Sequence, residues 1–294
     1  MKRVRLTALS ILMISYGGMA RSQGLPPGVQ SVIDEFKGQL YFAGKNLKTG
    51  AVIQYRADEK VTTASVIKVP ILVELYSQAN EHRLALEDVV AFTEGNRVEG
   101  SGILKSLGLG LRLTLRDVAV LMITMSDNSA TNMLIDKVGI AQVNARLRRI
   151  GLQETTLYKK VFKPAAGDVP PEQKKFGLGV TTANEMLALM DKIYRKEVVD
   201  AAACDDMIAI LKAQLDRDQI PRFLVGPGWE KVQVANKTGS LDQVRNDVGI
   251  VFTPSGDFIL SLFAQEAVDR KWTADNEAAV ILGRLALAIL KQWR

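Results

Sequence analysis

The distribution of strand patterns, which occur near both ends of the chain, limits the possible folds most strongly. Residues 39–58 have the pattern of a β-hairpin, with two apolar runs on either side of a turn at 46–50. Three more strands are expected at 231–237, 247–252 and 258–264, whereas the middle of the chain has mainly helical patterns. The simplest arrangement is a mixed α/β (α+β) fold. In it, one antiparallel five-stranded sheet is assembled from both chain ends and an all-helical lobe is inserted between them.

Several helix signals support this arrangement. A helix is expected from Ser65 to about residue 78, because its apolar residues recur at helical spacing. Thr114 and Asp117 have the spacing of a capping box that opens an apolar helix ending near Met125. Further helices are expected at 130–137, 182–190 and 274–292. Between 151 and 179 the periodicity is lost and prolines recur, which predicts a long loop of the kind that is often functional.

These patterns divide the chain into three parts. Residues 1–24 form a leader, residues 25–62 and 215–294 form the sheet lobe, and residues 63–214 form the helical lobe. Ligand sites favour the clefts between such units. We therefore expect the functional site between the two lobes.

The first 24 residues have the layout of a secretory signal peptide. Lys2, Arg3 and Arg5 precede an apolar run over 6–16, and small residues follow. The apolar run is too short to span a bilayer, and no cysteine lies near the expected cleavage region to carry a lipid anchor. Cleavage is expected near Ala20 or Ser22, and the loss of Lys2, Arg3 and Arg5 lowers the net charge from +6 to +3. We expect a periplasmic or secreted protein with neither a stable membrane anchor nor a nucleic-acid-binding surface.

Single cysteine and histidine residues exclude several kinds of chemistry. Cys204 has no second cysteine with which to form an intrachain disulfide, and clustered His and Cys ligands for zinc are absent. His82 lies in a polar stretch, and no G-x-S-x-G motif supports a Ser-His-Asp triad. We expect no metal and no cofactor, and a hydrolase of this sequence would need a base other than histidine.

Three short motifs occur in order along the chain, at Ser65–Lys68, Ser126–Asn128 and Lys237–Gly239. Each is weak alone, and a second K-T-G at 48–50 is interpreted as a hairpin turn because it lies between two expected strands. The ordered set is more specific, because each motif falls where chemistry requires it. The motifs are expected at a helix start, at a break between two helices and at the end of a strand, respectively.

The first motif combines a nucleophile and a base. Ser65 at a helix start would feel the positive end of the helix dipole, which favours a developing alkoxide. Lys68 lies one turn further along the same face and can reach the serine oxygen. A lysine that is partly desolvated beside a second cation titrates low enough to accept a proton.

The other two motifs supply groups that can hold a substrate. Ser126 can relay a proton to a leaving nitrogen, and the amide of Asn128 can hold a substrate carbonyl. Lys237 and Thr238 suit a substrate carboxylate, and a glycine at position 239 permits close backbone approach. The backbone N–H groups of Ser240 and Ser65 would form an oxyanion hole.

The ordered motifs resemble those of the class A β-lactamases and their penicillin-binding relatives. The similarity extends to residues 121–132, 179–183 and 237–250 and covers essentially the whole mature chain. It implies a β-lactamase/transpeptidase-like fold and an acyl-enzyme mechanism on cyclic amides. It also implies a role for each matching residue: Ser65 as acylated nucleophile, Lys68 as proton acceptor, Ser126 as proton shuttle, Asn128 as contact to the amide side chain, Lys237 and Thr238 as carboxylate site, Asn132 as support of the long loop, and Arg245 as a further cation for the carboxylate.

One feature departs from the family pattern. Class A enzymes carry, in an E-x-x-L-N loop segment, a glutamate that activates the hydrolytic water, and no such segment occurs between 151 and 180. Alignment from Gly151 places that position near Val161, which has no carboxylate. The remaining candidates for water activation are Glu154, Asp168, Glu172 and Lys68, of which Asp168 and Glu172 are favoured because they lie in the proline-rich loop. Acylation is thus predicted, and fast hydrolysis is not.

The leading hypothesis is an exported, monomeric class A β-lactamase that hydrolyses the β-lactam ring through an acyl-enzyme. One alternative is a D-alanyl peptidase or esterase that also binds penicillins. Another is a penicillin-binding sensor that turns over slowly. The expected partner in every case is a small β-lactam or D-alanyl peptide-like molecule.

Overall fold

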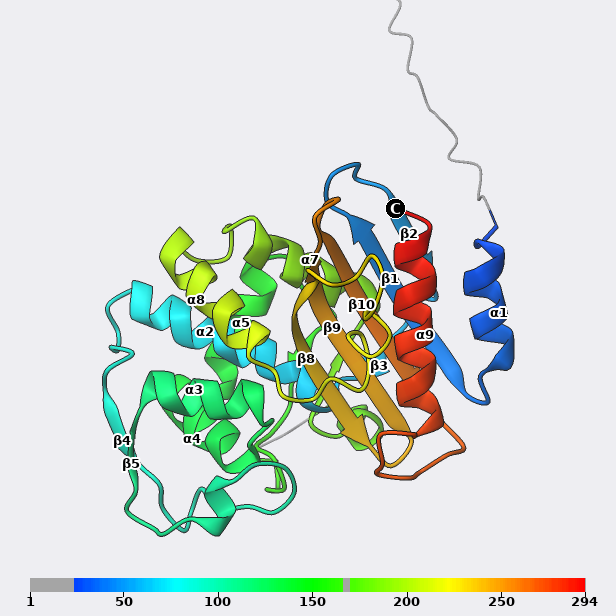
Figure 1. Cartoon of the computed structure of the whole chain (residues 1–294). Helices are drawn as coiled ribbons and strands as arrows, with labels where there is room; N and C mark the ends of the chain where they lie inside the picture. The colour runs from blue at the N-terminus through cyan, green and yellow to red at the C-terminus, as the bar shows by residue number, and fades with distance from the viewer. Residues whose placement is uncertain (1–23, 166–169, 294) are drawn as a thin grey trace, which may run out of the picture.

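A computed structural model describes residues 24–165 and 170–293, so the expected leader lies outside the described residues apart from Gly24. A five-stranded antiparallel sheet in the order β2-β1-β10-β9-β8 forms the centre (Figure 1). Its strands are β1 (Gln39–Asn46), β2 (Val52–Tyr55), β8 (Gln233–Leu241), β9 (Val244–Phe252) and β10 (Phe258–Gln265). The predicted sheet, assembled from both chain ends, is confirmed.

Alternate residues of the sheet enter two different apolar clusters. On β1, Tyr41 and Ala43 pack with the helical lobe, whereas Leu40 and Phe42 pack with α1 (Pro27–Glu35) and α9 (Glu277–Lys291). Figure 1 shows α9 and α1 on one side of the sheet and the helical lobe on the other. The sheet is buried on both faces and provides a rigid wall for the site.

The helical lobe is built around α2, whose side chains are almost all buried. Helices α3, α4, α5 and α8 pack against α2. The helices and 3₁₀ turns between the two parts of the sheet are η1 (Ala64–Ile67), α2 (Lys68–Asn80), η2 (Leu104–Ser106), α3 (Leu115–Thr124), α4 (Asn128–Val138), α5 (Ile140–Arg149), α6 (Gln173–Phe176), α7 (Ala183–Tyr194) and α8 (Ala201–Lys212).

Short strands complete the fold. Strands β3 (Val61–Thr62), β7 (Gly179–Thr181) and β6 (Thr156–Leu157) form a small sheet, and β4 (Val89–Ala91) pairs with β5 (Arg112–Thr114). Strand β3 leads directly into η1 and therefore places the first motif beside the end of the long loop. Across 24–165 and 170–293, none of the helices combines the length and hydrophobicity that a membrane crossing requires.

The sequence predicted several strongly patterned elements and missed others. The capping box of Thr114 and Asp117 is present at the start of α3. Helices α1, α5 and α8 were not predicted; α5 is strongly amphipathic, with Val143 and Leu147 as its buried residues, so its helical pattern was overlooked rather than absent. Several predicted boundaries differ from the structure: α7 ends at Tyr194 rather than 190, and β9 begins at Val244 rather than 247. The first α-helix of the helical lobe begins at Lys68 rather than Ser65, and β8 continues beyond the K-T-G motif to Leu241.

The buried Asp127 carboxylate connects two segments next to the site. Its Oδ1 accepts a hydrogen bond from Ala130 N (2.9 Å) at the start of α4, and its Oδ2 accepts one from Leu104 N (2.8 Å). Asp127→Ala should lower the free energy of unfolding by about 2–4 kcal/mol, because a helix cap is lost and a buried N–H is left unpaired. Denaturant unfolding measures this change.

Asp200→Ala is the matched control. The exposed Asp200 accepts only the capping bond from Ala203 N (2.8 Å). Its loss should cost about 1 kcal/mol. Equal losses in the two variants would contradict the connecting role of Asp127.

Candidate active site

Ser65 lies on the 3₁₀ turn η1, immediately before α2. The preceding residue, Ala64, has a left-handed backbone conformation with φ 46°, which is strained for a non-glycine residue. Ser126 (φ 54°) and Phe162 (φ 53°) have the same kind of strain. Three of these rare conformations therefore surround one site, which is the distribution expected where strain positions functional groups.

Lys68 is fully buried and is held by the second motif. Its Nζ lies 2.7 Å from Ser126 O, 3.0 Å from Ser126 Oγ and 3.0 Å from Asn128 Oδ1. A 3₁₀ turn has three residues per turn, so Lys68 lies one turn after Ser65 on the same side. Burial, reinforced by the charge of Lys237, holds the pKa of Lys68 well below its ordinary value. A neutral amine in this position can accept a proton.

The second motif lies between α3 and α4, as predicted. Asp127 caps α4, which leaves Ser126 facing Lys68 and brings Asn128 into the pocket lining. Asn128 Nδ2 donates to Glu99 O (3.1 Å), so that its oxygen faces Lys68. The motif thus joins α2 to the loop that carries Glu99.

Lys237 lies on β8, where it is fully buried. Its Nζ donates to Thr238 O (2.8 Å). Burial lowers its pKa to about 8, although the charges of Asp216 and Asp247 act in the opposite direction. Lys237 is therefore a cation at neutral pH and loses its charge only in mildly basic solution.

Gly239 permits the close approach of β8 to η1. A Cβ atom added at Gly239 would lie 2.8 Å from Thr63 O and 3.0 Å from Ser65 N. The Ser65 N–H itself makes no hydrogen bond to any residue in the described ranges. This N–H and the backbone of Ser240 are next to each other at the pocket wall, as an oxyanion hole requires.

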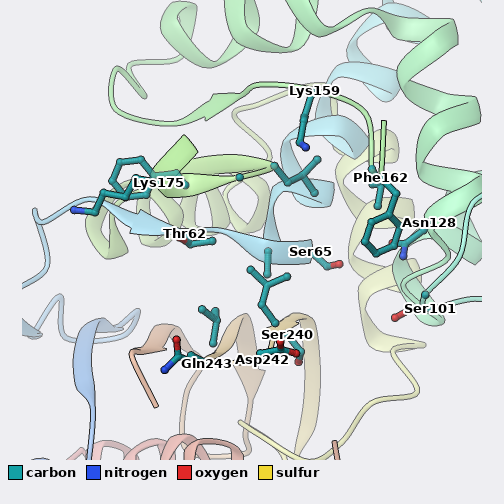
Figure 2. A pocket seen from close by; sticks show the side chains of 18 of the residues that line it. Thr62, Ser65, Ser101, Asn128, Lys159, Phe162, Lys175, Ser240, Asp242 and Gln243 are labelled. Carbon is teal, nitrogen blue, oxygen red and sulfur yellow. The ribbon is translucent and has the colours of Figure 1, made fainter. Parts of the chain in front are cut away.

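A cavity of about 940 Å³ opens in front of Ser65. Figure 2 shows Ser65 between the loop residues Lys159 and Phe162 on one side and Ser240 and Asp242 on the other. Lys68 and Lys237 lie behind the cavity wall rather than on it. The volume is in the upper part of the range of drug-sized ligand pockets.

The long loop is attached to α4 by two hydrogen bonds. Asn132 Nδ2 donates to Val161 O (3.0 Å), and Val161 N donates to Asn132 Oδ1 (2.8 Å). Val161 is buried in the pocket wall, and the next residue, Phe162, is 66% exposed with its ring beside Gly100. The loop position nearest the site is therefore apolar.

The loop carboxylates considered for water activation have other partners. Glu154 Oε2 lies 3.0 Å and Glu172 Oε2 lies 3.6 Å from Lys60 Nζ, and Tyr158 Oη donates to Glu172 Oε1 (2.7 Å). Neither acid lines the cavity. Asp168 lies outside the described residues. The preference for Glu172 as the water-activating residue is therefore not supported by its position.

The Arg245 side chain is occupied by partners other than those its expected role requires. It pairs with Ser240 on β8, whereas Asn246 pairs with Gly239 and so shares the face of Lys237. The Arg245 guanidinium donates to Leu241 O, Val244 O and Lys271 O and stacks on Trp272. We therefore do not assign it to the carboxylate site.

Asn246 is a site residue that the sequence argument missed. Its Nδ2 donates to Thr62 O (2.8 Å) and Thr63 O (3.0 Å), and its Oδ1 accepts from Gln265 Nε2 (2.8 Å). It holds the backbone that precedes Ser65 against the sheet. The sequence argument would have pointed to Asn246 if the strand had been aligned one residue further along, with Asn246 in place of Arg245.

Elsewhere, no cluster of three or more His, Cys, Asp or Glu residues suited to a metal ion occurs in the described portion.

Comparisons with known proteins agree with this arrangement. The family model described as "Beta-lactamase enzyme family" matches residues 27–293. A β-lactamase of Bacillus licheniformis is 26% identical over 230 residues, which cover 76% of this chain and 70% of that protein. The crystal structure of a β-lactamase from Sphaerobacter thermophilus superposes with a TM-score of 0.80, at 26% identity and with 90% and 96% of the two chains covered. PBP-A shares the fold, with a TM-score of 0.74 at 24% identity over 90% of this chain and 94% of PBP-A.

The two buried lysines predict a bell-shaped pH dependence for the acylation of Ser65 by a penicillin. If the neutral amine of Lys68, whose pKa lies well below its ordinary value, accepts the serine proton, the rate should rise with pH as this amine loses its proton. Above about 8, Lys237 loses its proton and the rate falls because the penicillin carboxylate is bound less well. Second-order acylation rate constants measured across the pH range test this.

A neutral ester substrate serves as the control. It has no carboxylate for Lys237 to bind, so its rate should rise with pH without the fall near the pKa of Lys237. The same fall for both substrates would contradict the separate roles of the two lysines.

Proposed function

Because the chain belongs to the β-lactamase enzyme family, we propose that it is an exported, class A-like serine hydrolase that forms an acyl-enzyme with β-lactams at Ser65. One observation carries the proposal. The buried amine of Lys68 lies one 3₁₀ turn after Ser65 and within 3.0 Å of Ser126 Oγ. This arrangement places the proposed proton acceptor one turn from the proposed nucleophile and in hydrogen-bond contact with a second hydroxyl.

The acylation step follows from these contacts. Neutral Lys68 accepts the proton of Ser65 Oγ as this oxygen bonds to the lactam carbonyl carbon. The Ser65 and Ser240 N–H groups stabilise the carbonyl oxygen as it becomes an oxyanion. When the C–N bond breaks, Ser126 donates its proton to the leaving nitrogen and recovers one from Lys68. The substrate carboxylate is held by Lys237 and Thr238.

In this proposal deacylation is the slow step of the reaction. Val161 is held beside the site by Asn132, at the loop position where class A enzymes carry the glutamate that activates water. An apolar side chain cannot act as a base. A missing general base slows the step it serves by roughly 10²–10⁴-fold. The same observation favours the alternative of a penicillin-binding protein that turns over slowly, including one whose natural substrate is a D-alanyl peptide or ester.

Intact-mass spectrometry with penicillin G tests the acylation proposal. The wild type should gain the mass of one penicillin, because Ser65 Oγ is the nucleophile, and Ser65→Ala should gain none. Ser101→Ala is the matched control, since Ser101 also lines the cavity and should leave the label in place. A label retained on Ser65→Ala would overturn the assignment.

The mass spectrum of protein recovered from the periplasm or medium also tests export, because the mature chain should lack about the first 20–24 residues.

Turnover of a chromogenic β-lactam tests the deacylation proposal. The reaction should begin with a burst of about one equivalent per enzyme and continue slowly, because the acyl-enzyme accumulates. Val161→Glu should accelerate the slow phase, and the matched Val161→Gln should not, because only the carboxylate can accept a proton. Rapid turnover of the wild type without a burst would contradict this account.

Product analysis with D-alanyl peptides and simple esters then distinguishes a peptidase or esterase from a β-lactamase.

A further inference from the structure

We propose that Lys159, Lys174 and Lys175 form a subsite for a second carboxylate, carried on the acyl portion of the substrate. We call these three residues the lysine rim. The inference rests on the proposed acylation of Ser65 and names the class of acyl donor that the site selects. That donor is dianionic: one carboxylate is held at Lys237 and Thr238, and a second, remote from the reacting bond, reaches the loop.

The lysine rim lies on the loop side of the cavity. All three lysines are among the cavity-lining residues, Lys159 from the loop and Lys174 and Lys175 from α6. Figure 2 shows the side chain of Lys159 descending from the loop toward the space above Ser65. Lys174 and Lys175 are exposed and Lys159 is half-buried, so that the three ammonium groups are available to a bound ligand.

Neighbouring lysines differ from the rim in having acidic partners. Lys160 Nζ lies 2.7 Å from Asp136 Oδ1, and Lys60 lies between Glu154 and Glu172. Among the described residues, by contrast, no rim lysine forms an ion pair. Lys175 makes a cation–π contact, with its Nζ 5.1 Å from the centre of the Phe176 ring. Glu154 and Glu172 are thus paired with Lys60 outside the cavity, whereas the three rim lysines are among the residues that line it.

The opposite wall has little charge to compensate for the rim. Asp242 is the one acid among the cavity-lining residues of the described chain, and Trp272 Nε1 donates to it (3.3 Å). Clefts lined by charges of one sign concentrate ligands of the opposite sign. The cavity therefore favours anionic ligands beyond the single carboxylate that Lys237 can hold.

The position of the rim assigns the second carboxylate to the acyl portion. Lys237 lies on β8, buried behind the sheet side of the cavity, whereas the rim lies on the loop side with Val161 and Phe162. Phe162 approaches the side of the pocket where Asn128 lies, and we expect Asn128 to contact the amide of the acyl side chain. The part of the substrate that passes Asn128 and reaches the loop remains attached to the carbonyl carbon.

A matched pair of penicillins tests the subsite: benzylpenicillin, and its analogue with an additional carboxylate on the acyl side chain. The measured quantity is the ratio of their second-order acylation rate constants, dianion over monoanion, at low and at physiological ionic strength. Replacement of all three rim lysines by Gln should lower this ratio about tenfold at low ionic strength. Salt should reduce the difference, because exposed charges are screened. The matched control is Lys160→Gln, a neighbouring loop lysine that is paired with Asp136 and should leave the ratio unchanged.

The outcomes separate the subsite from the proposed function. A ratio that does not respond to the triple substitution, while both penicillins label Ser65, overturns the subsite alone. If neither penicillin labels Ser65, the proposed function fails. Equilibrium binding of the same two penicillins to Ser65→Ala then decides the subsite independently, since the triple substitution in that background should selectively weaken binding of the dianion. Equal weakening of both ligands, or an equal effect of Lys160→Gln, also overturns it.

Discussion

Burial of the Lys68 amine between two lobes is the constraint on which the rest of the site depends. An uncompensated charge in such a place is costly, so the surroundings favour the neutral amine. Ser126 and Asn128 receive its hydrogen bonds, and both come from the break between α3 and α4. The helical lobe, packed against the sheet, thus buries a lysine and holds its pKa well below the ordinary value.

The loop shows how a scaffold can be kept while its chemistry changes. Asn132 binds both backbone groups of Val161, so the loop is held at the site whatever side chain position 161 carries. Backbone contacts of this kind position a residue without determining its chemistry. With valine there, the described part of the loop presents an apolar side chain where the proposed deacylation would need a base.

Much of the fold could be read from the chain because its patterns are strong. The five strands alternate between two apolar clusters, and Thr114 with Asp117 marks the start of α3. Helix α5 is amphipathic and was overlooked, whereas the short strands carry little local signal. The short strands form because they pair with strands that are distant in the sequence, and a local sequence pattern carries no information on such pairing.

For the site, the sequence by itself determined which residue types carry the chemistry and in what order, because the motifs are local. It also determined that position 161, whose backbone Asn132 binds, carries a valine and not a carboxylate. Only the tertiary structure decided which side chains meet. It turned Arg245 away from Lys237 and put Asn246 on that face, because a change of one residue in register reverses the face of a strand. It also directed Glu154 and Glu172 to Lys60 and placed the lysine rim along the cavity, since the path of an irregular loop is set by long-range contacts.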